Sequence, residues 1–152
     1  MVPVRVSRYV YLDGGVPRDM YPGASFSWSD KDAPEAREAR LRAVREQGKG
    51  VALPPPPISE FAVTKPSDVA WLQRRLRPMP VQTYIGTFTL KNSGSNGLKR
   101  TYIASSKPPY ASFVPTHQRI REDHTWSFTT IEAGHDAMVT APEELASLLM
   151  AV

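Results

Sequence analysis

The chain has 152 residues, a length that suits one domain, and 41% of them are apolar, which favours a folded core over disorder. Its net charge is +4, and it has no cysteine, which excludes disulfides and cysteine-based metal sites and is typical of a reducing compartment. Since no apolar run is long enough to span a membrane and the first residues do not resemble a signal peptide, we expect a cytoplasmic protein with no membrane contact.

Much of the basic excess lies in two arginine-rich segments, residues 37–45 and 74–77. Acidic residues are interspersed in the first segment, which is typical of a solvated helix face. No nucleic-acid recognition motif accompanies either segment. Binding to nucleic acid is therefore the weakest functional hypothesis, and we expect none.

The first predicted element is a strand over residues 4–12, rich in Val and Tyr, as in a buried strand of a parallel sheet. It ends at Asp13, which precedes two glycines. A carboxylate just beyond a parallel strand occupies the position where α/β folds place their chemistry. An aspartate before two glycines is also typical of a simple turn, and the spacing alone favours this second interpretation of Asp13.

The next part of the chain is rich in proline. Residues 16–32 are predicted to form a loop or a short broken helix, residues 33–47 a surface helix, and residues 54–57 an extended run of four prolines. A second helix over residues 67–76 is stopped by the prolines that follow. These helices predict an excursion away from the main sheet.

Residues 81–90 alternate in a pattern typical of extended structure, and a strand is predicted over residues 99–105. The polar loop between them contains Ser95 in a setting that resembles the nucleophile elbow G-x-S-x-G. However, Ser93 stands where the first glycine should be, and the elbow requires a helix directly after the serine. Because a strand follows instead, Ser95 is not expected to be a nucleophile.

A helix is predicted over residues 111–123, with His117 in a possible buried stripe. His117 and His124 could in principle join His135 at a metal ion. Their spacing matches no known ligand pattern, and isolated histidines are usually structural or exposed. We expect neither a metal nor a cofactor.

The last segment begins with a strand over residues 126–131, followed by a turn at Gly134 that presents His135. Thr140 and Glu143 predict a capping box at the start of a final helix. His135 is a candidate general base, because the imidazole pKa lies near neutrality. Strands that alternate with helices predict an α/β fold with a parallel sheet.

Four parts of the sequence together resemble the C-terminal part of an α/β-hydrolase, in the bacterial esterase branch related to plant methylesterases and hydroxynitrile lyases. The His135 segment is the most specific of the four. The parts are Tyr9-Val10-Tyr11-Leu12-Asp13 with Val16-Pro17-Arg18-Asp19, the Pro54 to Pro57 run with Phe61 and Trp71-Leu72, Arg100-Thr101-Tyr102-Ile103, and Gly134-His135-Asp136-Ala137-Met138-Val139-Thr140.

The resemblance implies a single partial α/β-hydrolase domain over residues 1–152. Residues 4–19 would hold a core strand and the acid loop, residues 20–80 a lid, and residues 81–152 the C-terminal strands and the histidine loop. The three predicted strands would be the sixth, seventh and eighth of an eight-stranded sheet, and His135 would be the triad histidine.

The sequence departs from this family in two ways. The triad acid usually follows the seventh strand, but residues 102–121 contain no Asp or Glu, and only Ser105, Ser106 and Lys107 lie near the expected place. Some α/β-hydrolases supply the acid from the end of the sixth strand, which here is Asp13. The first five strands, the nucleophile elbow and the oxyanion-hole donors have no counterpart in the chain.

We therefore expect a carboxylic-ester hydrolase of the serine esterase type, truncated and inactive or weak alone, with His135 and Asp13 as catalytic residues and a small-molecule ester as substrate. One alternative is a non-catalytic interaction fragment that self-associates or pairs through the open edge of the strand over residues 4–12. Another is one half of a split hydrolase, completed by a separate chain.

Overall fold

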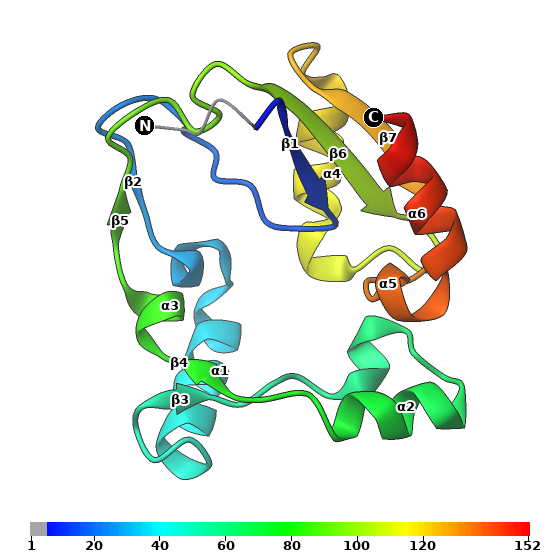
Figure 1. Cartoon of the computed structure of the whole chain (residues 1–152). Helices are drawn as coiled ribbons and strands as arrows, with labels where there is room; N and C mark the ends of the chain where they lie inside the picture. Colours follow the sequence, from blue (N-terminus) through cyan, green and yellow to red (C-terminus); the bar gives the residue numbers. More distant parts are fainter. Residues whose placement is uncertain (1–5) are drawn as a thin grey trace. The chain divides into compact units, whose positions relative to one another are not determined.

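A computed structural model describes residues 6–152 of the chain, which form two compact units (Figure 1). Each unit is built from separate stretches of sequence. Among the described residues, unit 1 comprises residues 6–16, 57–72 and 95–152, and unit 2 comprises residues 17–56 and 73–94.

Unit 1 is built on a sheet of three parallel strands, β1 (Arg8–Leu12), β6 (Lys99–Ser105) and β7 (Ser127–Ile131), in the order β1-β6-β7. The last five residues of β6 are buried, as the central position requires. Parallel strands in this order confirm the predicted partial α/β-hydrolase fold. Of the expected first strand, residues 4 and 5 lie outside the described residues, and β1 starts only at Arg8.

The helices of unit 1 cover both faces of this sheet. Successive residues of a strand point to opposite faces, so each strand contributes side chains to both helix layers. On one face, Ile103 and Ile131 form a core with Leu145 of α6 (Pro142–Ala151). On the other face, Tyr102 meets α4 (Val114–Glu122), which connects β6 to β7. The remaining helical elements of unit 1 are η2 (Ile58–Phe61), α2 (Pro66–Gln73, whose last residue falls in unit 2), η3 (Ala111–Phe113) and α5 (Ala137–Thr140).

The predicted capping box at the final helix is wrong. Thr140 ends the short helix α5, and its hydroxyl donates to the carbonyl of Asp136 at 3.3 Å. The residue that precedes α6 is Ala141, which provides no side-chain cap. The threonine hydroxyl is already used within the preceding turn, a common competition for such side chains.

Unit 2 contains one long helix and several short elements. They are β2 (Ser25–Phe26), η1 (Trp28–Lys31), α1 (Pro34–Glu46), β3 (Ala52–Leu53), β4 (Met79–Pro80), α3 (Gln82–Ile85) and β5 (Phe88–Thr89). Strand β2 pairs antiparallel with β5, and β3 pairs antiparallel with β4. Val44 is the buried residue of α1, which confirms the predicted surface helix.

The prediction of extended structure over residues 81–90 is wrong for its first half, where the chain forms α3. Val81, Tyr84 and Ile85 all pack into the core of unit 2, together with Val44 and Leu53. A spacing of three and four residues places side chains on one side of a helical turn, whereas a strand would send Val81 and Tyr84 to opposite faces.

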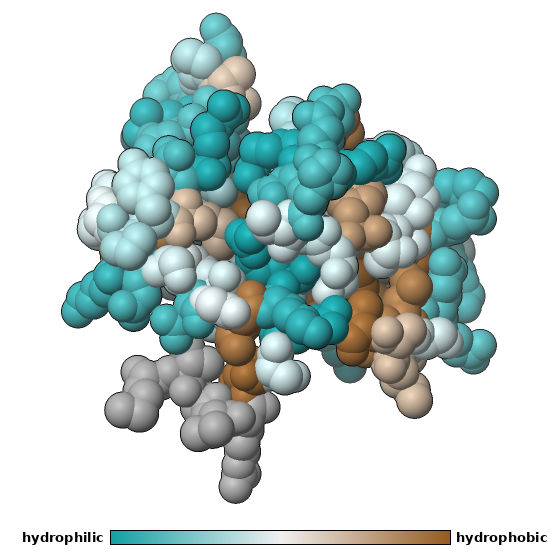
Figure 2. All heavy atoms as spheres, turned by 90° about the horizontal axis from the view of Figure 1, so that it is seen from above, coloured by the Kyte–Doolittle hydropathy of each residue, from teal (hydrophilic) through white to brown (hydrophobic). Residues whose placement is uncertain are grey.

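Hydrophobic residues also reach the surface in places. In Figure 2 they form small separated patches among hydrophilic residues on the face shown. In unit 1, Val10 of β1 is 37% exposed and Met150 of α6 is 87% exposed. Among the described residues, no helix is both long and apolar enough to cross a membrane.

Candidate active site

The site lies where the parallel strands of unit 1 end. Asp13 follows β1 directly and has a φ of 41°, in the left-handed region that Asp tolerates better than most residues. Its backbone N–H continues the strand pairing by donating to the carbonyl of Ile103 at 2.8 Å. Its side chain is fully buried beside β6.

The Asp13 carboxylate accepts four hydrogen bonds. Oδ1 accepts from the backbone N–H of Ser105 at 3.0 Å and from Nε2 of His117 at 2.7 Å. Oδ2 accepts from the hydroxyl of Ser105 at 2.5 Å and from Nδ1 of His135 at 2.8 Å. A carboxylate has about four lone-pair positions, so these donors fill its capacity.

These contacts fix the charge of Asp13. Burial by itself raises the pKa of the Asp13 carboxyl, but hydrogen bonds from His135 and from the hydroxyl and backbone of Ser105, together with the charge of His117, outweigh it and leave the pKa lowered. Asp13 is therefore ionised at neutral pH and can only accept hydrogen bonds. It follows that both histidine rings donate to it.

His135 is oriented by its hydrogen bond to Asp13. Because Nδ1 carries the proton that bonds Asp13, the neutral ring has its basic lone pair on Nε2. The side chain remains 23% exposed, so the ring is not sealed in the core. An imidazole whose Nδ1 is bonded to a buried carboxylate can accept a proton on Nε2 and return it.

Three aromatic rings surround the imidazole of His135. Tyr110 stacks on it with ring centroids 4.3 Å apart and an interplanar angle of 19°. Phe113 and Phe61 lie at 5.6 and 5.7 Å. These rings restrict the orientation of the imidazole, and an aromatic face also favours a cation placed against it.

Gly134 is required by a close approach. A Cβ at this position would lie 2.5 Å from the Cβ of Ala62 and 2.9 Å from the carbonyl oxygen of Phe61. Its φ lies outside the left-handed region, so the predicted need for the conformational freedom of glycine is not the reason for a glycine here. The glycine instead lets the segment that carries Phe61 pack directly against the histidine turn.

Asp13 and His135, the two residues selected from the sequence, are thus in direct contact across 122 positions of sequence. His117 is a third member of the cluster that sequence reasoning did not identify. The three-residue spacing to Ile120 indicated that His117 faces inward, and both are buried, but no local signal identified its partner. His124 is exposed and takes no part.

The serines noted in the sequence have other roles. The hydroxyl of Ser105 is used by Asp13, and that of Ser106 donates to the carbonyl of Ile131 at 2.8 Å. Ser95 starts a turn whose next residues, Asn96 and Gly97, have positive φ, and β6 follows at once. Ser95 therefore lacks the helix that a nucleophile elbow requires.

Within residues 6–152, no group of three or more His, Cys, Asp or Glu side chains could hold a metal ion. In the cluster at Asp13, Nδ1 of His135 and Nε2 of His117 both carry protons that bond the carboxylate.

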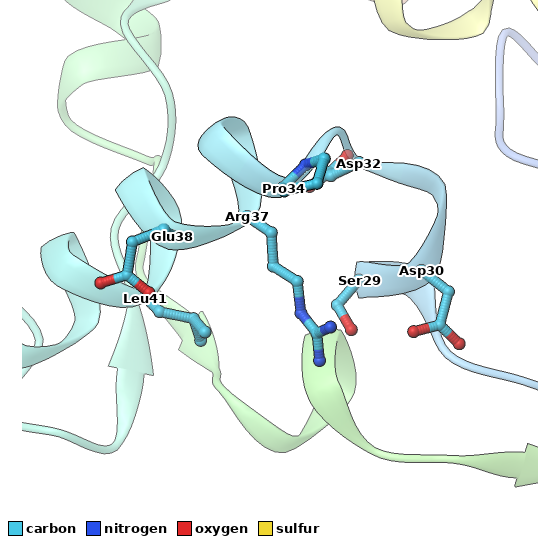
Figure 3. Close-up of a pocket in the computed structure, with 7 residues that line it drawn as sticks. All are labelled: Ser29, Asp30, Asp32, Pro34, Arg37, Glu38 and Leu41. Atoms are coloured by element: carbon cyan, nitrogen blue, oxygen red, sulfur yellow. The ribbon is translucent and has the colours of Figure 1, made fainter.

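Each unit also has a surface pocket. In unit 1, a pocket of about 310 Å³ lies beside the histidine turn and is lined by Thr64, Lys65, Lys107 and Gly134, among others. In unit 2, a pocket of about 450 Å³ has a lining of mixed charge, in which Arg37 extends from α1 toward Ser29 (Figure 3). The second pocket contains no histidine.

Comparisons with known proteins bear on the fold. No family model and no curated protein matches the sequence. A similar solved structure is described as an extracellular α/β-hydrolase from a Paenibacillus species that shares structural and functional homology with tobacco salicylic acid binding protein 2. The match has a TM-score of 0.71 and 18% identity, and covers 99% of this chain and 63% of that chain. The fold is therefore that of part of an α/β-hydrolase, and the chain spans less than two thirds of the neighbour's length.

Proposed function

We propose that this chain supplies the acid and base of a carboxylic-ester hydrolase of the serine type. The observation that carries the proposal is the 2.8 Å hydrogen bond from Nδ1 of His135 to the buried, ionised carboxylate of Asp13. In the reaction, Nε2 of His135 takes the proton of an attacking serine, and Asp13 stabilises the resulting imidazolium. The substrate is a small-molecule ester.

The nucleophile is the missing part. The sequence contains no G-x-S-x-G, and Ser95, Ser105 and Ser106 are unsuited to the role. Loss of a triad serine lowers kcat by about 10⁶-fold in a well-studied protease. We therefore propose that the chain alone has little or no esterase activity and depends on a second segment that carries the elbow.

The Asp–His pair is tested by proton NMR on the purified chain. We expect a strongly downfield imidazole N–H resonance from His135 that disappears in Asp13→Asn and in His135→Ala but persists in His117→Gln, because His117 donates to the same carboxylate. His124→Gln is the matched control and should leave the resonance in place, because His124 is exposed. Absence of the resonance in the unaltered chain, at low temperature and neutral pH, would contradict the proposal.

Activity is tested with a short-chain aryl ester. Hydrolysis by the chain should match that by His135→Ala within error. If a separate polypeptide with the nucleophile elbow is added, turnover should appear and should require His135. Clear turnover by the chain alone, lost in His135→Ala, would show that one of its own serines is the nucleophile.

A non-catalytic interaction fragment is the second candidate, favoured by the position of β1. In the sheet formed by residues 6–152, β1 is an edge strand, and Val10 at its centre is 37% exposed. An open edge of this kind is a template for pairing with another strand. A defined dimer in sedimentation, combined with no effect of the elbow-bearing polypeptide, would favour this candidate.

A further inference from the structure

His117 is a buried titratable group that the proposed mechanism does not use. It lies on α4, its side chain is 10% exposed, and its Nε2 is 2.7 Å from Oδ1 of Asp13. An acid that orients one histidine needs only that histidine and enough donors to stay ionised. Ser105 already supplies two such donors through its backbone and its hydroxyl.

The two imidazoles compete for the same carboxylate. His117 donates to Oδ1 and His135 to Oδ2, so each ring withdraws electron density from the acceptor that the other uses. A proton added to either ring places a full positive charge on one side of Asp13 and leaves less of its negative charge for the other ring. Sites that interact in this way titrate as a pair and not as independent groups.

The other groups around His117 do not disturb this coupling near neutral pH. From β6, the ring of Tyr102 meets the imidazole edge-on at 5.6 Å, and burial followed by the charge of Asp13 raises the pKa of the Tyr102 phenol, which stays neutral. On α4 itself, Arg119 carries a constant charge, and its guanidinium donates to the carbonyl of Val16. The group that shares the carboxylate with His117 is therefore His135, and a further ionisable neighbour of His135 is Asp136, whose pKa is raised by burial.

We propose that His117 is a positioning residue that lowers the proton affinity of His135 by sharing the carboxylate of Asp13. The relevance of this effect to catalysis rests on the proposed function, but the effect itself does not. A general base works best when its pKa lies near the working pH, and a strongly paired carboxylate would otherwise raise that pKa. The second histidine moderates the pull of Asp13 on the first.

The test is an NMR titration of the imidazole signals in the full chain, which has three histidines and hence three sets of signals. In the unaltered protein, the titration curve of each of these two imidazoles, His117 and His135, should show a second inflection caused by the other. His124, which is exposed, should show one independent step. Two independent single steps for His117 and His135 would overturn the proposal.

Variants of His117 give the direction of its effect on the pKa of His135. His117→Leu removes the donor at Oδ1, so the pKa of His135 should rise. His117→Gln keeps a neutral N–H donor at that place, so it should restore part of the lower value, and His124→Gln should change nothing. A role of His117 in packing alone would leave the pKa of His135 unchanged in both His117 variants, and that result or a fall in pKa would refute the proposal. If His117→Leu does not fold, His117→Gln and the unaltered chain decide.

Asp13→Asn separates this inference from the proposed function. Removal of the shared anion should lower the pKa of both His117 and His135. If Asp13→Asn lowers the pKa of His135 while the His117 variants do not alter it, the inference fails and the proposed acid–base pair stands. If Asp13→Asn leaves the pKa of His135 unchanged, the acid–base pair itself fails.

Discussion

Asp13 combines complete burial with four hydrogen-bond donors, so its carboxylate contributes to stability as well as to the proposed chemistry. Its pKa is lowered in the folded state, below the value of about 3.9 of an unfolded chain. A group of this kind adds stability that is fully present above the unfolded pKa. That stability is lost as the pH falls through the folded pKa.

Replacement of Asp13 by Asn should therefore remove stability at neutral pH and flatten the acid limb of the stability curve. We expect a loss at pH 7 of about 1–3 kcal/mol, because buried donors lose a charged acceptor. Urea unfolding at pH 7 and at pH 3 measures both effects. Equal losses at the two pH values would contradict this prediction.

Asp136 is a matched control for the direction in which a shifted aspartate pKa changes the stability of the fold. Burial raises the pKa of Asp136, an effect that outweighs the lowering by the charge of His135. A raised folded pKa means that ionisation opposes folding, so this contribution to stability declines as the pH rises through the folded pKa. Asp136→Asn should accordingly leave stability at pH 7 unchanged or slightly increased, opposite in direction to Asp13→Asn.

Tyr110 should stabilise the protonated form of His135. Its ring lies flat against the imidazole, and a cation against an aromatic face gains about 0.5–1 kcal/mol at a partly exposed site. Tyr110→Leu should remove this stabilisation, which an NMR titration of the imidazole would show as a fall in the pKa of His135. Phe113→Leu is the control, because the Phe113 ring is tilted by 46° at 5.6 Å, and its effect should be smaller. Equal shifts in the two variants would argue against a specific role of the stack.

At the level of elements, the histidine turn depends on the segment that follows η2. The backbone of Gly134 lies so close to Ala62 that a methyl group at residue 134 has no room. Ala62 itself has a φ of 60°, in the left-handed region that most residues avoid. The turn that carries the proposed base and the segment that carries Phe61 therefore pack directly against each other.

Gly134→Ala should destabilise the protein by about 1–3 kcal/mol, the usual cost of an overpacked site. In the double variant, Ala62→Gly removes the methyl group that the added methyl at residue 134 would meet. The double variant should therefore be more stable than the sum of the two single effects predicts. Gly14→Ala is the control, since a Cβ there meets only the carbonyl oxygen of Leu12 at 3.7 Å. Chemical denaturation of the four variants and the unaltered chain measures the coupling. Additive effects at residues 62 and 134 would show that the contact is not tight.

At the level of the whole molecule, β1 is an edge strand of the parallel sheet that residues 6–152 form in unit 1. The N–H of Asp13 bonds β6, and the period of two along a strand places the N–H groups of Val10 and Leu12 on the opposite edge of β1. Open strand edges pair readily with other chains. We propose this edge of β1 as the surface through which the chain would associate.

Hydrogen exchange resolves this association at single amides. In dilute solution, the amides of Val10 and Leu12 should exchange quickly, while those of Tyr102 and Ala104 in the central strand should be protected. At high protein concentration, protection should appear at Val10 and Leu12 if chains pair through β1. Val10→Lys, which places a charge at the centre of this edge strand, should abolish the dependence on concentration. Protection of Val10 and Leu12 that is independent of concentration would contradict pairing between copies.

Three strands in a parallel sheet, with Asp13 and His135 beyond strand ends, were predictable from the sequence through local patterns, namely the period of two, the residues rich in Val and Tyr, and the glycines that follow. The order of the strands came from the resemblance to an α/β-hydrolase. The local pattern failed at residues 82–85, where tertiary burial of Val81 and Tyr84 on one side selected a helical turn. It failed again at Thr140, whose hydroxyl bonds within the preceding turn.

Only the tertiary structure placed His117 on Asp13, across 104 positions of sequence. It also showed that Gly134 is needed for a close approach and that Ser105 supports the carboxylate. Contacts between segments so far apart depend on how α4 packs on the sheet, and no period in either segment carries that information. The physical reason is that a buried carboxylate must collect its donors from whatever elements surround it.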